Sequence, residues 1–462
     1  MRIRFLILWG CAALIASIAL PSGIPSTAAP KPAPAQASPR PPDEAARFSA
    51  FVEGLWPDAQ KAGVSRQTFD RAFLGVRLDP SVIGHTEKQA EFERSIRDYL
   101  ASAVAPRQVE QGRALAARWS DALAAVEQRF GVDRHIVVAL WGLESNYGAG
   151  IGGKDVIASL ASLAFIGFRG GLFRDELIAA LVMLEQGHVA RAEMKGSWAG
   201  AMGQAQFMPS SFMKYAIAFD GGARKDIWTN TPDVLASIAN FLKGYGWRPG
   251  LPWGFEVVLP QGFDYRLSRA SFSEWRRRGI ARADGEAMPA SGEALLFFPV
   301  GWRGPVFLIS DNFFVIKTYN TSDSYALSVG TLADRIGGAQ GFRAAWPPVI
   351  DGLDHEGRLE AQRLLQKLGL YADKLDGFLG PALREAVRRF QAQSGMIADG
   401  FPTPELLAKL RAAPCGGGRA SANKTSDRVE PSFLLRSNGG STIMPLETAC
   451  RGPWPGHGSL TE

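Results

Sequence analysis

Residues 137 to 148 form an apolar run that closes on one carboxylate: Val137-Val138-Ala139-Leu140-Trp141-Gly142-Leu143, then Glu144, then Ser145-Asn146-Tyr147-Gly148. Read as a helix, the run places Leu140 and Trp141 one turn before Glu144, on an apolar face. Asp133 can cap its start, and Gly148 with Gly150 can end it. A carboxylate in such surroundings loses solvation, so its pKa rises towards the range in which a glycosidase acid works.

A glutamate near the end of a core helix is more often a solvated residue or a salt-bridge partner, so this run alone does not assign a function. A second segment adds to it. Residues 196–211 place small residues around an indole, two amides and several hydroxyls, with almost no charge. Glycines let the backbone approach a ligand closely, while Gln and Ser side chains offer the groups that sugar hydroxyls and acetamides bind.

Together the two segments resemble the lytic murein transglycosylases of the membrane-bound B type, glycoside hydrolase family 103. The resemblance covers roughly Ala46 to Trp346, and it includes Gln89-Ala90-Glu91-Phe92, Asp226-Ile227-Trp228 and Tyr319-Asn320-Thr321-Ser322 in the family order. It implies a mainly α, lysozyme-like helical catalytic domain. A shift to short apolar runs between Gly244 and Arg303 predicts a small strand-containing insertion in that domain.

The resemblance also implies roles for single residues. Glu144 matches the glutamate that first protonates the glycosidic oxygen between N-acetylmuramic acid and N-acetylglucosamine, and then takes the proton of the muramic acid 6-hydroxyl to give a 1,6-anhydro sugar. No second catalytic carboxylate is then required. Ser197 matches a serine that orients the substrate acetamide, and Gln206 matches a substrate-binding glutamine. Tyr319, Asn320 and Tyr325 match residues that position the glutamate or the sugar; the alternative is that they only satisfy buried backbone groups.

Related enzymes often carry a calcium loop, and here the matching stretch reads Asp220-Gly221-Gly222-Ala223-Arg224-Lys225-Asp226. Only Asp220 and Asp226 offer carboxylates, and two cations stand where a metal would bind. Hard cations need six or more oxygen ligands. We therefore expect neither calcium nor another cofactor. The five histidines and three cysteines have no zinc-ligand spacing, so no metal site is expected from them.

Composition indicates a globular, multidomain protein, with 462 residues, of which 46% are hydrophobic and 21% charged. A net charge of +6 and a pI near 9.2 suit work beside an anionic polymer such as the cell wall. The basic residues are dispersed and form no recognisable nucleic-acid module, so nucleic acid is not expected as a partner.

The N-terminus has the order of a cleavable secretory signal peptide: Arg2 and Arg4, an apolar stretch from Phe5 to Leu20, and small residues after it. Cleavage is expected after Ala28, with Ala37 as the alternative. Cys11 lies inside the apolar run, where a lipidated cysteine is not found, so we do not expect a lipoprotein. The expected location is the periplasm, where Cys415 and Cys450 could form one disulfide.

A second module follows a Pro/Gly-rich boundary. Residues 359–410 predict three short helices with two Asp-Gly turns, Asp376-Gly377 and Asp399-Gly400, and resemble the peptidoglycan-binding domain. Leu383 departs from that family, which often has threonine there. The expected organisation is signal peptide 1–28, spacer 29–43, catalytic domain 44–346, linker 347–357, peptidoglycan-binding domain 358–412 and a disordered tail 413–462.

The sequence therefore predicts a lytic transglycosylase that cleaves the β-1,4 bond between N-acetylmuramic acid and N-acetylglucosamine. Its expected partners are peptidoglycan glycan strands, and other cell-wall enzymes are further candidates; a monomer is expected. Two alternatives stay open at this point. One is a hydrolytic muramidase, in which water attacks in place of the 6-hydroxyl, and the other is an inactive peptidoglycan-binding scaffold.

Overall fold

The computed structural model describes residues 42–88, 95–222, 224–349 and 351–413. The predicted signal peptide and disulfide, most of the predicted spacer and tail, and the motif at residues 89–92 lie outside these residues; residues 42 and 43 of the spacer form the start of the first helix. The chain divides into two compact units, with the division between residues 350 and 351. Within the described residues, no helix is both long and apolar enough to cross a membrane.

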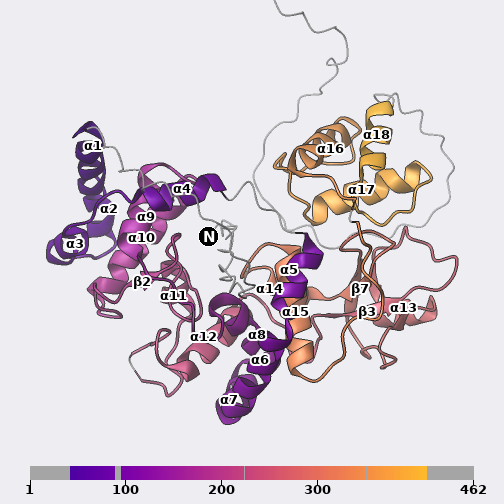
Figure 1. Ribbon diagram of the computed structural model, residues 1–462, viewed down its shortest axis with the longest axis horizontal. Helices are drawn as coiled ribbons and strands as arrows, with labels where there is room; N and C mark the ends of the chain where they lie inside the picture. The colour runs from indigo at the N-terminus through magenta and orange to yellow at the C-terminus, as the bar shows by residue number, and fades with distance from the viewer. Residues whose placement is uncertain (1–41, 89–94, 223, 350, 414–462) are drawn as a thin grey trace, which may run out of the picture. The chain divides into compact units, whose positions relative to one another are not determined.

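The first unit is mainly helical, as predicted (Figure 1). Its first nine helices are α1 (Pro42–Glu53), α2 (Trp56–Lys61), α3 (Arg66–Phe73), α4 (Pro80–Lys88), α5 (Ile96–Ala103), α6 (Pro106–Arg118), α7 (Ser120–Phe130), α8 (Arg134–Ser145) and α9 (Val156–Phe165). They are followed by α10 (Leu172–Glu185), α11 (Pro209–Tyr215), α12 (Thr231–Gly244), α13 (Phe272–Arg277), α14 (Asp311–Ile316) and α15 (Asp323–Ile336). A short antiparallel pair, β1 (Lys154–Asp155) and β2 (Lys195–Gly196), joins two loops of this unit.

Helix α8 is the centre of the first core. The Asp133 carboxylate caps it by accepting hydrogen bonds from the amides of His135 and Ile136, at 2.7 and 3.3 Å. Its residues from 136 to 142 are all buried, because α8 packs against α6, α7, α12 and α15 (Figure 1). Burial of each large apolar side chain contributes about 1.5–3 kcal/mol, so the position of α8 is fixed by packing on several sides.

The predicted insertion is a five-stranded antiparallel sheet with its own apolar core. It contains β3 (Gly254–Val258), β4 (Arg269–Ser271), β5 (Ala281–Arg282), β6 (Glu293–Phe297) and β7 (Val306–Ile309), in the order β4-β6-β7-β3-β5. The predicted insertion, from Gly244 to Arg303, ended too early, because β7 lies beyond Arg303. All four residues of β7 are buried, because this strand occupies the middle of the sheet between β6 and β3.

One tryptophan joins the sheet to α15. Trp253 precedes β3 and packs over Gly330, where an added Cβ would lie 2.3 Å from the indole ring. Its indole N–H donates to the Asp334 carboxylate, at 3.1 and 3.2 Å from the two oxygens. Burial raises the pKa of Asp334 to about 7. The contact between the sheet and α15 therefore depends on Gly330, the Trp253 indole and the buried, titratable Asp334.

The second unit has the three predicted helices, α16 (His355–Lys367), α17 (Pro381–Gln393) and α18 (Pro404–Ala412). Each Asp-Gly turn is held by a glutamine: the Gln362 side-chain oxygen accepts from the Gly377 amide, and that of Gln391 accepts from the Gly400 amide, both at 2.8 Å. Leu383, the departure from the family pattern, is buried in the core of this unit. An apolar side chain there adds to the core and leaves the helices unchanged.

Candidate active site

The end of α8 differs from the sequence prediction in one respect. Gly148 and Gly150 do not end the helix; Asn146 does so two residues earlier, with a left-handed backbone (φ 49°), and Tyr147 follows in the same region (φ 56°). Asparagine is among the few residues that adopt this conformation readily. The Tyr147 hydroxyl then donates to the carbonyl oxygen of Gln108 on α6, at 2.8 Å. The turn after Glu144 is therefore bonded to the neighbouring helix α6.

Glu144 occupies the last turn of α8 and is only 8% exposed. Burial raises the pKa of its carboxyl group to about 8, although a hydrogen bond from the Tyr325 hydroxyl to Oε1 acts in the opposite direction. Among the described residues, no second carboxylate contributes to this shift. Glu144 is therefore mostly protonated at neutral pH, which is the state that a general acid needs.

Tyr325 comes from α15, whose start is fixed by Ser322, since the Ser322 hydroxyl accepts from the Tyr325 amide at 3.4 Å. Burial and the nearby Glu144 carboxyl raise the pKa of the Tyr325 hydroxyl well above its ordinary value. This phenol stays protonated and acts as a hydrogen-bond donor to Glu144. The structure thus brings together two of the residues that the sequence singled out, across 181 positions of chain.

Tyr319 and Asn320 lie in the connection between α14 and α15. The Tyr319 hydroxyl donates to the backbone oxygen of Ala205 at 2.8 Å, and its ring is buried. Asn320 is half-buried, and its side-chain oxygen accepts from the Ser322 amide at 3.2 Å. Both polar groups therefore bond to backbone groups inside the protein, as in the alternative considered for these residues. A direct contact with substrate stays a prediction.

Gln206 lies in the predicted sugar-binding segment and has an unusual backbone conformation. Its backbone is left-handed (φ 48°), and its side-chain amide donates to the carbonyl oxygens of Gly203 at 2.8 Å and Ile151 at 3.2 Å. Ile151 lies in the loop that follows α8. Gly203 also has a left-handed backbone, and an added Cβ would lie 2.6 Å from the Ile227 oxygen. Gln206 is thereby placed beside the loop of Glu144 at some cost in backbone strain.

Ser197 lies in a tight turn directly after β2. Its amide donates to the Ala201 carbonyl at 2.8 Å, and its hydroxyl accepts from the Ala201 amide at 3.1 Å. Gly152 approaches this turn so closely that an added Cβ would lie 2.2 Å from the Gly196 oxygen. The loop after α8 therefore contacts both the Ser197 turn and the Gln206 segment.

Sequence reasoning missed Gln204. Its buried side-chain oxygen accepts a hydrogen bond from the Trp141 indole N–H at 2.9 Å, and its side-chain nitrogen donates one to the Trp228 carbonyl oxygen at 2.8 Å. Trp141 lies one turn before Glu144, so Gln204 joins helix α8 to the segment of Gln206. A signal for it was present, because an indole N–H on a fully buried helix needs an acceptor.

The stretch that matches the calcium loop of related enzymes has two carboxylates, Asp220 and Asp226, and both accept hydrogen bonds from backbone amides. The Asp220 carboxylate accepts one from the Gly222 amide at 2.8 Å. The Asp226 carboxylate accepts hydrogen bonds from the amides of Trp228 and Thr229, both at 2.9 Å. Burial would raise the pKa of Asp226, but hydrogen bonds from the Thr229 hydroxyl and from these amides lower it, and the Arg224 guanidinium, 3.9 Å from the carboxylate, adds to the lowering. In the part of the chain that the structure describes, no group of three or more His, Cys, Asp or Glu side chains could hold a metal.

Comparison with known families gives two matches. Residues 47–334 match the family described as transglycosylase SLT domain, and residues 354–410 match the putative peptidoglycan binding domain. The chain is 32% identical over 246 residues to membrane-bound lytic murein transglycosylase B of Escherichia coli (strain K12). That match covers 52% of this chain and 66% of the relative, slightly less than two thirds of its length.

Solved structures are similar over a larger share of the chain. The crystal structure of SltB3 from Pseudomonas aeruginosa, in complex with NAG-anhNAM-pentapeptide, is 44% identical with a TM-score of 0.73. The similarity covers 79% of this chain and 99% of that one. The Escherichia coli lytic transglycosylase Slt35 in complex with calcium is 27% identical with a TM-score of 0.53, over 63% of this chain and 93% of that one.

Proposed function

Because this chain belongs to the transglycosylase SLT domain family, we propose that it is a lytic transglycosylase of peptidoglycan. The observation that carries the proposal is the protonated, buried Glu144 at the end of α8, next to a phenol donor. The crystallised relative SltB3 holds a peptidoglycan fragment with an anhydro sugar. We propose the bond between N-acetylmuramic acid and N-acetylglucosamine as the substrate of this chain.

The first step is proton donation. Glu144 gives its proton to the glycosidic oxygen as the bond from that oxygen to C1 of muramic acid breaks, and the leaving sugar departs with a new hydroxyl. The positive charge that forms at C1 is stabilised by the acetamide of the substrate, which Ser197 orients. The side chain left behind is a carboxylate in an apolar site, held by the Tyr325 hydroxyl.

The second step uses the same carboxylate as the base. It takes the proton of the muramic acid 6-hydroxyl while O6 bonds to C1, so the 1,6-anhydro ring closes and Glu144 regains its proton. Glycosidases with two catalytic carboxylates place them about 5–9.5 Å apart. The proposed mechanism needs only one, because the group that gives the first proton then accepts the second.

The other parts of the chain fit action on the cell wall. We propose that the second unit attaches the enzyme to peptidoglycan, since it matches a peptidoglycan binding domain. Export by the N-terminal signal, with work in the periplasm as a monomer, is part of the same proposal. The proposed mechanism uses no metal ion.

Digestion of purified peptidoglycan, with mass spectrometry of the soluble products, tests the proposal. A transglycosylase releases fragments with 1,6-anhydro ends, while a muramidase releases reducing ends that are heavier by one water. Products with reducing ends would replace the proposal with hydrolysis. A folded enzyme that releases nothing would favour the inactive scaffold.

A further inference from the structure

Helix α4 carries a histidine that none of the steps above uses. His85 is half-buried and stacks on the indole of Trp198, with ring centroids 5.4 Å apart and an angle of 16° between the planes. Trp198 directly follows Ser197, the residue proposed to orient the substrate acetamide. The stack therefore lies next to the expected sugar-binding turn.

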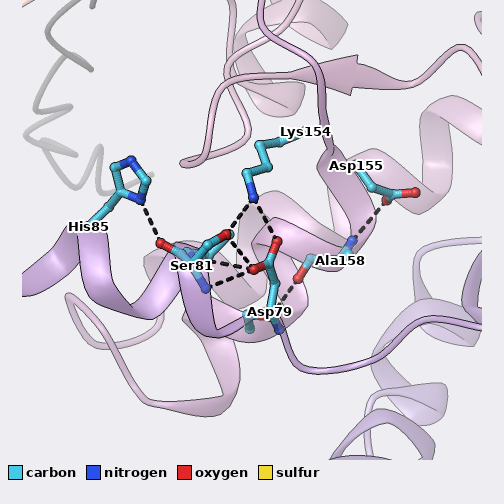
Figure 2. A network of polar contacts seen from close by, with 8 residues as sticks. Asp79, Ser81, His85, Lys154, Asp155 and Ala158 are labelled. Atoms are coloured by element: carbon cyan, nitrogen blue, oxygen red, sulfur yellow. Dashed lines mark hydrogen bonds and ion pairs between the residues drawn. The ribbon is translucent and has the colours of Figure 1, made fainter. Parts of the chain in front are cut away.

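The orientation of the His85 ring is fixed by one hydrogen bond. Its Nδ1 lies 2.5 Å from the Ser81 carbonyl oxygen, one turn earlier on α4. A carbonyl only accepts, so Nδ1 carries the proton, and in the neutral ring Nε2 is an acceptor. Figure 2 shows that the other ring nitrogen points away from α4. An acceptor is thus presented beside the Trp198 ring.

The start of α4 is held in place by an ion pair. Asp79 accepts from the Ser81 amide at 2.9 Å and from Lys154 Nζ at 3.1 Å, and Lys154 also contacts the Ser81 hydroxyl (Figure 2). The Asp79 amide in turn donates to the Ser162 hydroxyl at 2.9 Å. These bonds join both α9 and β1 to the first turn of α4.

The same strand fixes Trp198. Lys154 is in β1, and its register partner is Gly196 of β2, two residues before Trp198. His85 and Trp198 are therefore both held on β1, one through Asp79 and the other through the β1–β2 pair. A stack held at both ends keeps its geometry when a ligand binds, which favours a binding role over a ring that only fills space.

We propose that His85 determines specificity for the glycan strand: its Nε2 accepts a hydrogen bond from a hydroxyl or acetamide N–H of the sugar next to the one whose acetamide Ser197 orients. This inference rests on the proposed function, because it takes peptidoglycan glycan as the ligand. His85 would affect how tightly the strand binds and take no part in proton transfer.

Binding measurements on a Glu144→Gln background test this role without turnover. The probe is a soluble tetrasaccharide of alternating N-acetylglucosamine and N-acetylmuramic acid, and calorimetry gives Kd. His85→Phe keeps the stack and removes the acceptor, so Kd should rise about three- to tenfold, the range for one neutral hydrogen bond. His85→Ala removes the stack as well and should weaken binding at least as much.

His188→Phe is the matched control, since His188 is another half-buried histidine with one aromatic neighbour, Phe212. Its Kd should stay within twofold of the parent. In the active enzyme, His85→Phe should raise KM and leave kcat within twofold. An unchanged Kd for folded His85→Phe would overturn the inference. Failure of the unaltered enzyme to release anhydro ends would instead overturn the proposed function, whatever the Kd values.

Discussion

The Tyr325 hydroxyl on α15 donates a hydrogen bond to Oε1 of Glu144 at the end of α8. This bond favours the charged carboxylate, while burial favours the neutral acid and has the larger effect on the pKa. Glu144 must be neutral to protonate the glycosidic oxygen and charged to accept the proton of the 6-hydroxyl. The phenol therefore assists the second state without abolishing the first.

Replacement of Tyr325 by Phe should raise the pKa of Glu144 further, because it removes the one contact that lowers it. The alkaline limb of the kcat profile should move to higher pH. We expect kcat to fall about tenfold or more, since a hydrogen bond to a charged group is worth about 1.5–3 kcal/mol. A pH profile of anhydro-product release measures both. Tyr371→Phe in the second unit is the control, and a profile identical to it would contradict the role of Tyr325.

Glu144→Gln should abolish turnover while it retains glycan affinity, because the amide keeps the shape of the side chain and carries no transferable proton. General acid catalysis contributes about a hundredfold or more. Release of soluble fragments from peptidoglycan measures the loss, and calorimetry with the tetrasaccharide measures binding. Residual activity within about tenfold of the parent would remove Glu144 from the mechanism.

The buried acid should also make stability depend on pH. The pKa of Glu144 is about 8 in the folded protein and 4.5 in the ordinary state, so the unfolded chain holds fewer protons between these values. The contribution of Glu144 to the free energy of unfolding is therefore fully present below pH 4.5 and is lost as pH rises through 8. Relative to the parent, Glu144→Gln should gain at least about 1 kcal/mol in the free energy of unfolding between pH 5 and pH 8.

Denaturant titration at the two pH values measures this gain. Asp334→Asn is a second case with the same sign, since the pKa of Asp334 is raised to about 7. Glu405→Gln, on the exposed face of α18, serves as the control without a buried acid. Equal gains for all three variants would show that burial of Glu144 is not the cause.

Calcium should not stabilise the folded chain. The carboxylates of Asp220 and Asp226 are bonded to backbone amides, and Arg224 places positive charge beside them. We expect melting temperatures in calcium and in a chelator to agree within experimental error. An upward shift that saturates with calcium would show that the loop still binds the ion.

Deletion of residues 353–462 should weaken binding to insoluble sacculi and spare the cleavage of soluble glycan chains. All the residues proposed for catalysis come before Trp346, so the second unit should raise the effective concentration of enzyme on the polymer and leave the chemistry unchanged. Pelleting with sacculi and turnover of soluble chains measure the two effects. A truncated enzyme that pellets as completely as the full chain would contradict this division.

The sequence predicted those features that depend on local pattern. Asp133 as the helix cap, burial of Glu144 and the three helices of the second unit all follow from short-range periodicity and turn residues. The end of α8 was wrong by two residues, because Asn146 adopts the backbone that glycine was expected to provide. Both asparagine and glycine adopt this left-handed conformation at helix ends, so residue preferences alone do not decide between Asn146 and Gly148.

Contacts between distant segments could not be predicted in the same way. The bond between Tyr319 and Ala205, and the two bonds of Gln204, depend on the packing of helices that are far apart in sequence. The sequence identified Tyr319 as a candidate but did not show where its hydroxyl would point. Resemblance to a family identified the residues, and only the fold gave each polar atom its partner.

The position of β7 has a consequence for the unity of the sheet. This strand is the last of the sheet in sequence, yet it pairs with β6 on one side and β3 on the other. Without β7, the pairing of the other strands would leave two separate ribbons, β4 with β6 and β3 with β5. Two-stranded ribbons are marginally stable in water. The sheet is therefore completed only by residues 306–309, immediately before the segment that brings Tyr325 to Glu144.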